Sequence, residues 1–228
     1  MSPILYLYAL VDEEPSGSLG EGIEGEPLRL VHGSGGTGIA AVAGELGDRP
    51  RPEREALQRQ EAVVRRLAEL FGALLPARFG EAFADEAELE ERISSRGEEL
   101  GASLALVRGC VQMTLRVFGD PETLEAEAEP AGGPGARYLE SRRRERERAR
   151  SLPEIDPLRE ALRPLLRAER IERQAAGRLL GTAYHLVLRA QTGAYLATLE
   201  EAKGQIGGRR VAASGPFPPY AFAPETAP

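Results

Sequence analysis

The stretch ILYLYALV, residues 4–11, decides how the chain begins to fold. Its side chains are aliphatic or aromatic without exception, and it ends in an acidic turn before Pro15. Aromatic and β-branched side chains favour strands, and an unbroken apolar run of this length is typical of a strand covered on both faces. The sequence therefore predicts a buried strand at residues 4–11.

Composition limits the class of protein. The 228 residues suffice for one large or two small domains. Trp is absent and aromatic residues make up 5% of the chain, so aliphatic side chains must dominate the core. A formal net charge of -7 argues against a general nucleic-acid binder, which needs a basic surface. The first apolar run has no basic segment before it and is too short to cross a bilayer, so we expect a cytoplasmic protein with no membrane partner.

The first half alternates strand and helix signals. Two short strands are expected on either side of the glycine-rich turn at 33–38, which has neither the lysine nor the following helix of a phosphate-binding loop. A long helix is expected from Pro52 until Pro76 ends it. Its apolar stripe, with one polar member, consists of Leu57, Gln60, Val64, Leu67, Phe71 and Leu74.

A second helical region and a strand complete this half. Asp85 is the expected N-cap, with Glu88 closing a capping box. A break is expected within 94–97, followed by a helix that carries Leu100, Leu104 and Val107 on its apolar side. Alternating polarity in CVQMTLRVFG, residues 110–119, predicts a half-buried strand. Cys110, the single cysteine, begins that strand and is interpreted as an inert small side chain.

The second half begins after an acidic, glycine- and proline-rich segment. Residues 120–137 are expected to be a linker or exposed loop. Residues 138–150 hold six arginines and three glutamates, which predicts a solvated helix with internal ion pairs or a docking face for an acidic partner. A helix capped by Asp156, a strand at 181–190, a helix at 192–203 and a final strand should follow.

This order of elements predicts an α+β fold. Both halves suit split β-α-β layers, in which an antiparallel sheet is covered by helices on one face. The expected domains are residues 1–119 and 138–228, separated by the linker. The C-terminal stretch GPFPPYAF, residues 215–222, is expected to form a strap that joins the halves, because its prolines stiffen the chain and its aromatic rings can pack.

Residue patterns that support catalysis are missing from the sequence. It contains no paired-cysteine metal motif, no HExxH, no GxSxG and no Walker loop. His32 and His185 are each interpreted as structural polar residues. We therefore expect no enzymatic activity, no catalytic residues, no cofactor and no metal site.

Five blocks in order along the chain carry a family resemblance. They are YLYALV (6–11), LLPARFGEAFADEAELEERI (74–93), GARYLESRRRERE (135–147), GTAYHLVLR (181–189) and GPFPPYAFAP (215–224). Together they resemble the gas vesicle protein family GvpL/GvpF. This sequence has Phe217 where the family often has Trp, and Gln58, Arg59 and Gln60 where relatives often carry a histidine.

The resemblance implies a function and an architecture. Members of this family are non-enzymatic accessory proteins for building gas vesicles, in contact with the small hydrophobic shell subunit and with other accessory proteins. The implied fold is two α+β domains, each a ferredoxin-like variant, and the implied location is the gas vesicle in the cytoplasm. The alternative function is a small-molecule-binding or enzymatic protein on ferredoxin-like domains, and a third is a structural component that stays on the finished shell.

Two segments supply the candidate partner-binding residues. In LLPARFG, Arg78 and Phe79 are residue types that often dominate interfaces, and Gly80 permits a conformation that other residues avoid. The alternative is that Phe79 fills the core and Arg78 pairs with a carboxylate. In the arginine-rich segment the candidates are Arg142, Arg143 and Arg146.

Overall fold

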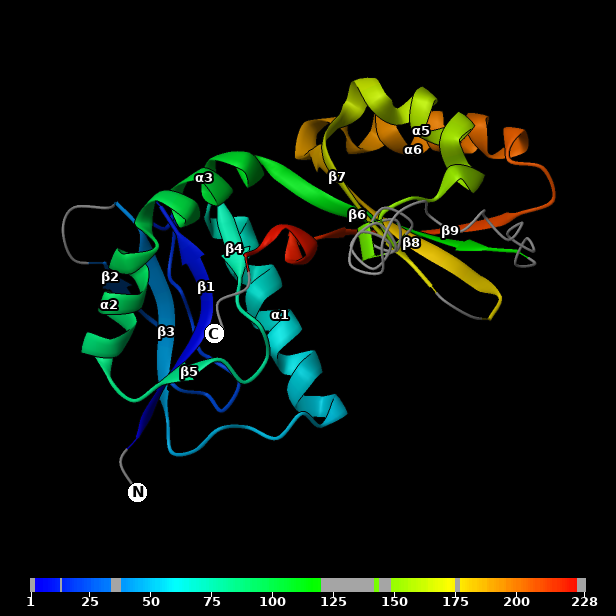
Figure 1. Cartoon of the computed structure of the whole chain (residues 1–228). Helices are drawn as coiled ribbons and strands as arrows, with labels where there is room; N and C mark the ends of the chain where they lie inside the picture. Colours follow the sequence, from blue (N-terminus) through cyan, green and yellow to red (C-terminus); the bar gives the residue numbers. More distant parts are fainter. Residues whose placement is uncertain are drawn as a thin grey trace, which may run out of the picture. The chain divides into compact units, whose positions relative to one another are not determined.

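The computed structural model describes residues 3–12, 14–33, 38–119, 142–143, 149–174 and 177–224. They form an α+β fold with two antiparallel sheets and helices (Figure 1), as predicted. The chain divides into two compact units: unit 1 is Met1–Val111 with Phe217–Pro228, and unit 2 is Gln112–Pro216. The predicted domains, 1–119 and 138–228, stay a prediction, and the linker at 120–137 lies outside the described residues.

Strand β1 organises the sheet of unit 1. All of its residues except Ile4 are buried, so the prediction of a buried first strand is confirmed. The sheet order is β2-β3-β1-β4, and β5 also pairs with β1. The strands are β1 (Ile4–Val11), β2 (Arg29–His32), β3 (Ala40–Leu46), β4 (Leu74–Pro76) and β5 (Ala82–Phe83).

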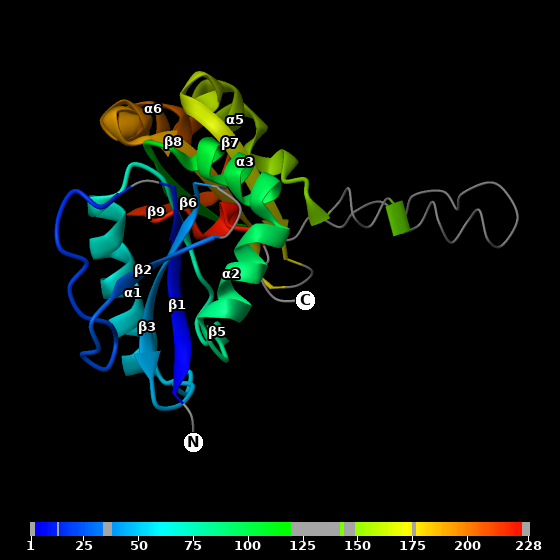
Figure 2. The same ribbon diagram turned by 90° about the vertical axis from the view of Figure 1, so that its left-hand side faces the viewer.

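Helices cover both faces of this sheet, whereas one covered face was expected. Helix α1 (Arg54–Leu70) lies on one side of β1, and α2 (Glu86–Ser95) and α3 (Gly97–Val107) lie on the other (Figure 2). A central strand with apolar side chains on both faces needs this arrangement, because an uncovered face would leave them in water.

The predicted end of the first helix is wrong. Helix α1 ends at Leu70, and Phe71 already has an extended backbone with φ -120° and ψ 141°. Leu74 and Pro76 belong to β4, which pairs with β1. Proline is tolerated there because β4 lies at the end of the strand order, where a missing N–H breaks no ladder. Leu57, expected on the apolar stripe, is 44% exposed.

The next two helices follow the prediction closely. The Asp85 side chain accepts a hydrogen bond from the Glu88 N–H at 2.9 Å, and Glu88 accepts one from the Ala84 N–H at 2.7 Å. The chain breaks between α2 and α3 at Arg96, inside the expected 94–97 interval. The apolar residues predicted for the second helix, Leu100, Leu104 and Val107, are buried.

Strand β6 (Cys110–Phe118) is more deeply buried than expected. Gln112 and Thr114 are each 5% exposed, although alternation had placed them on a solvent face. They satisfy each other through a hydrogen bond of 3.1 Å from Gln112 Nε2 to Thr114 Oγ1. Along this face the exposed polar residue is Arg116.

Unit 2 contains α5 (Asp156–Leu162), β7 (Leu166–Arg173), β8 (Leu179–Leu188), α6 (Thr192–Ala202), β6 from Gln112 onward and β9 (Arg210–Phe217) up to Pro216. Its sheet order is β7-β8-β6-β9, and α5 and α6 lie on the same side of it (Figure 1). The predictions of β8, α6 and β9 are confirmed, and β7 was not predicted. Asp156 is not the N-cap: Ile155 is, because the turn at Pro153–Ile155 runs directly into α5.

Candidate functional site

The loop Ala77–Glu81 interrupts the strand pairing beside β1. The Ala77 N–H donates to the Tyr8 carbonyl at 2.9 Å, and the Leu7 N–H donates to the Glu81 carbonyl at 2.9 Å. Between these two contacts the chain makes a turn closed by the Glu81 N–H and the Arg78 carbonyl at 3.2 Å. Both ends of the loop are therefore fixed to the central strand of unit 1.

Gly80 makes this turn possible. Its φ is +84°, in the left-handed region that side chains with a Cβ avoid. It occupies the third position of the four-residue turn, where a type II turn needs glycine. The expectation that Gly80 supplies an unusual conformation is confirmed.

Two buried polar side chains fix the loop from below. The Tyr6 hydroxyl accepts from the Gly80 N–H at 2.9 Å and donates to Gln60 Oε1. Gln60 Nε2 in turn donates to the Ala77 carbonyl at 3.3 Å. Burial raises the pKa of the Tyr6 phenol, the Gly80 N–H opposes that rise, and the charges of Glu26 and Glu81 add to it. A single network thus joins β1, α1 and the loop.

The loop brings the first pair of candidate residues together at the surface. Arg78 is exposed, and its backbone N–H donates to Glu81 Oε2 at 3.4 Å. Phe79 is half-buried and meets the Tyr6 ring edge to face, with centroids 6.4 Å apart. Phe79 therefore covers the buried network without joining the fully buried core.

Glu81 adds a feature that no sequence signal indicated. Its Oε1 atom is buried and has no hydrogen-bond partner among the described residues. A buried acceptor without a partner costs about 1–3 kcal/mol. The loop thus holds a carboxylate oxygen whose burial is a cost to the fold.

The tail packs on unit 1. Arg65 lies over the Phe217 ring at 5.9 Å, and Pro218, Pro219 and Phe222 are buried. The turn η6 (Tyr220–Phe222) contacts β4. Burial, with Glu61 adding and Arg65 opposing, raises the pKa of the Tyr220 phenol to about 12.

The remaining candidates lie in unit 2. Arg142 and Arg143 are helical and exposed, and Arg146 lies outside the described residues. Of the two histidines, His32 is exposed at the end of β2 and His185 is fully buried in β8.

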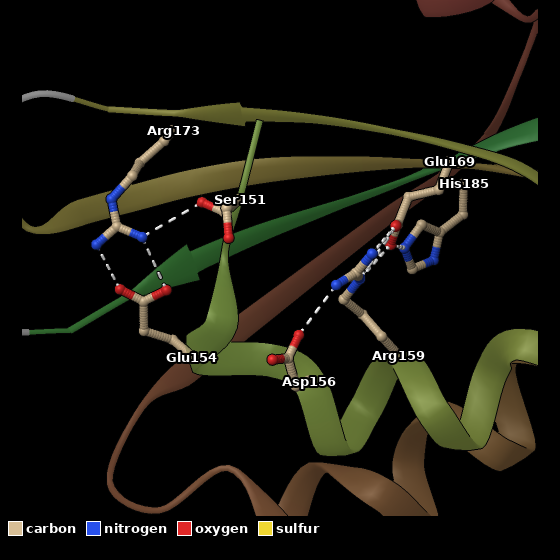
Figure 3. A network of polar contacts seen from close by, with 7 residues as sticks. All are labelled: Ser151, Glu154, Asp156, Arg159, Glu169, Arg173 and His185. Atoms are coloured by element: carbon tan, nitrogen blue, oxygen red, sulfur yellow. Dashed lines mark hydrogen bonds and ion pairs between the residues drawn. The ribbon is translucent and has the colours of Figure 1, made fainter. Parts of the chain in front are cut away.

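His185 on β8 belongs to a polar network with Glu169 on β7 and Arg159 on α5, which Figure 3 draws, and with Tyr195 on α6. Its Nδ1 lies 2.8 Å from the Tyr195 hydroxyl on α6, and its Nε2 lies 3.1 Å from Glu169 Oε1 on β7. Arg159 on α5 donates to both Glu169 oxygens, from Nε at 3.0 Å and from Nη2 at 2.5 Å. Burial opposes ionisation of Glu169, but the bonds from His185 and Arg159 outweigh it and lower its pKa to about 2.

A second buried ion pair involves Arg173, which lies on β7 like Glu169. Arg173 donates to both oxygens of Glu154, at 3.0 and 2.6 Å, and to the Ser151 carbonyl at 3.4 Å (Figure 3). The Glu154 side chain is only 3% exposed. Each of the polar side chains named in these two networks has a partner inside the fold. We therefore interpret the networks as fixing α5 and α6 to the sheet. This fits the structural role predicted for His185.

No group of three metal-ligating side chains occurs within the described ranges. Among the helices of the same part of the chain, none combines the length and apolar character that crossing a membrane requires.

The fold and these sites define a two-unit α+β protein with a rigid surface loop on one unit and buried ionic networks in the other. The chain belongs to the family described as gas vesicle synthesis protein GvpL/GvpF, whose model matches residues 4–224. This confirms the resemblance. The family is one of gas vesicle proteins and is not a known family of enzymes.

Solved structures share the fold. The crystal structure of the gas vesicle protein GvpF from Anabaena sp. PCC7120 matches with a TM-score of 0.73 and 17% identity, over 98% of this chain and 97% of that one. GvpF from Microcystis aeruginosa matches with a TM-score of 0.73 and 19% identity, over 97% of this chain and 99% of that one. No curated protein matches the sequence.

Proposed function

We propose that this protein is a gas vesicle accessory protein that binds the hydrophobic shell subunit and supports vesicle assembly, by nucleation or chaperoning, in the cytoplasm. The observation that carries the proposal is the family match over residues 4–224. We further propose that it works without catalysis and contacts other gas vesicle accessory proteins, with no nucleic-acid or membrane partner.

The physical task explains why such a protein is needed. A shell subunit destined for a water-repelling wall exposes apolar surface before it is assembled. A partner that covers this surface and then releases it needs a limited contact area and modest affinity. It must also stay dissolved itself, and a net charge of -7 supports this.

We assign the shell-subunit contact to the loop Ala77–Glu81. Arg78 is exposed and Phe79 is half-buried on a backbone that Tyr6 and Gln60 hold in place. A preformed loop loses little conformational entropy on binding.

The tail and the second unit have separate proposed roles. We propose that residues 215–222 act as a strap, since the chain passes from unit 2 to unit 1 there and its rings pack on unit 1. We also propose that unit 2, with its order β6-α5-β7-β8-α6-β9, is the ferredoxin-like variant. Unit 1 starts with three successive strands and departs from that order.

The test is retention of the purified shell subunit on the immobilised full-length protein. Arg78→Glu and Phe79→Ala should reduce retention, while Arg51→Glu, an equal charge change at an exposed position of unit 1, should not. Circular dichroism must show that each variant is folded. Absence of retention by the wild-type protein contradicts the proposal, and equal retention by all variants moves the contact away from this loop. Immunodetection on purified vesicles then distinguishes a transient chaperone from a retained component.

A further inference from the structure

Charge is divided unevenly between the two units. By sequence, unit 1 has 11 basic residues against 21 acidic ones, and unit 2 has 18 against 15. The net charge of -7 is therefore the sum of an acidic unit 1 and a basic unit 2. A local basic surface in unit 2 can attract an anionic partner although the whole chain is acidic.

The face of the unit 2 sheet turned away from α5 and α6 gathers part of this basic charge. Along β6, Leu115 and Val117 lie in the core under the helices, so Arg116 and Phe118 point to the other face. On β8, Ala183 lies in the same core, which places Tyr184 on the other face too.

The outer strands continue this face. Arg170 on β7 is the cross-strand partner of Tyr184, while the next residue, Ile171, packs on the core. Arg210 on β9 lies over the Phe118 ring, 4.6 Å from its centroid. The sheet order β7-β8-β6-β9 thus sets these residues side by side, and we call them the sheet-face patch: Arg170, Tyr184, Arg116, Phe118 and Arg210.

The patch is accessible and held in place. Its three arginines are exposed, and its two rings are half-buried. The Tyr184 hydroxyl donates to Glu172 Oε2 at 3.0 Å. Burial and this bond raise the pKa of the Tyr184 phenol, and the nearby positive charge of Arg116 acts in the opposite direction. Among the described residues named for this patch, three guanidinium groups stand with the one carboxylate of Glu172, so this set of side chains carries a net positive charge.

We propose that the sheet-face patch of unit 2 docks an acidic segment of a partner protein. Exposed guanidinium groups on three strands of the sheet fit carboxylates spaced along an extended chain. The rings beneath them supply apolar contact and hold Arg210 by a cation–π interaction. A short acidic peptide fits better than a nucleic acid, because a net charge of -7 disfavours a long polyanion as a partner.

The experiment measures fluorescence anisotropy of a labelled glutamate-rich peptide with the full-length protein at low salt. A matched peptide with glutamine at each glutamate is the probe control. Binding should weaken as the salt concentration rises, because the Debye screening length falls to about 3 Å at 1 M ionic strength. Arg116→Glu and Arg210→Glu should each weaken binding by about tenfold or more.

The matched control variant is Arg163→Glu, an exposed residue of unit 2 in the turn that follows α5. It should bind like the wild type. Arg116→Gln replaces Arg116→Glu if the charge reversal prevents folding. No binding by the wild type, or equal binding by all variants, overturns the proposal. If only the double variant Arg142→Glu/Arg143→Glu loses peptide binding, the contact belongs to the arginine-rich segment. If oligothymidylate binds more tightly than the peptide, the partner is a nucleic acid. If light scattering shows a salt-sensitive dimer, the partner is a second copy of this chain. Each of these three results also overturns it.

Discussion

The Tyr6 hydroxyl and the Gln60 side chain, 54 positions apart in the sequence, are joined by a buried hydrogen bond. Tyr6 also accepts from the loop that presents Arg78, and Gln60 donates to the start of that loop. A glutamine on the apolar side of α1 is thereby explained: it links the helix to the candidate site.

Gln60→Ala should lower the free energy of unfolding by about 1–3 kcal/mol, because the Tyr6 hydroxyl and the Ala77 carbonyl both lose a buried partner. Chemical denaturation measures the change. Gln58→Ala removes an exposed glutamine of the same helix and should change stability by less than about 0.5 kcal/mol. Equal effects of the two substitutions would contradict a role for the buried network.

Gly80→Ala should destabilise the protein by about 1–2 kcal/mol, because alanine is strained at a φ of +84°. Open space surrounds the position where its Cβ would lie, so the loss reports backbone strain alone. Gly47→Ala is the control, since it also meets open space and lacks a left-handed φ. Thermal unfolding of both variants, with shell-subunit retention, shows whether the loop conformation matters for binding.

Arg173→Ala should cost about 3–5 kcal/mol, because it leaves the buried Glu154 carboxylate without its partner. Burial alone raises the pKa of Glu154, and the Arg173 hydrogen bond is the largest influence that lowers it below the ordinary value. Arg173→Met with Glu154→Gln should recover part of the loss. The exposed pair of Arg59 and Glu55 offers the contrast, and Glu55→Gln should leave denaturant unfolding unchanged.

Glu169 makes stability depend on pH. Its folded pKa of about 2 lies below the ordinary value of 4.5, so its contribution is complete above about pH 5 and is lost as pH falls towards 2. A shift of this size corresponds to ~3 kcal/mol. The stability difference between the wild type and Glu169→Gln should therefore be largest near about pH 7 and shrink in acid.

Urea unfolding across this pH range measures that difference. Glu160→Gln, at an exposed position of the same helix as Arg159, is the control and should parallel the wild type. A difference that does not change with pH would show that the Glu169 carboxylate is not held in its charged form.

Local sequence patterns were enough to predict those helices and strands whose signals lie within the element itself. The apolar run of β1 indicated burial on both faces, and Asp85 with Glu88 indicated the start of α2. The three leucine and valine positions of α3 were predicted from helical spacing alone. Such signals are local because a cap or an amphipathic stripe is complete within a few turns of chain.

The sequence did not reveal which distant segments pair as strands. Leu74 continues the helical spacing of α1, yet it lies in β4 and pairs with β1. The charged strand β7 lacks a regular alternation of apolar and polar residues, and its place in the sheet is set by pairing with β8.

By itself, then, the sequence determined the family, the α+β class and the order of most elements, because ordered blocks and local periodicity carry that information. Only the tertiary structure decided that Tyr6 and Gln60 support the loop at Arg78, that Glu169 and His185 meet, and that arginines from three strands share one face. These relationships depend on which strands pair and in what register, which is set by long-range packing and not by any local pattern.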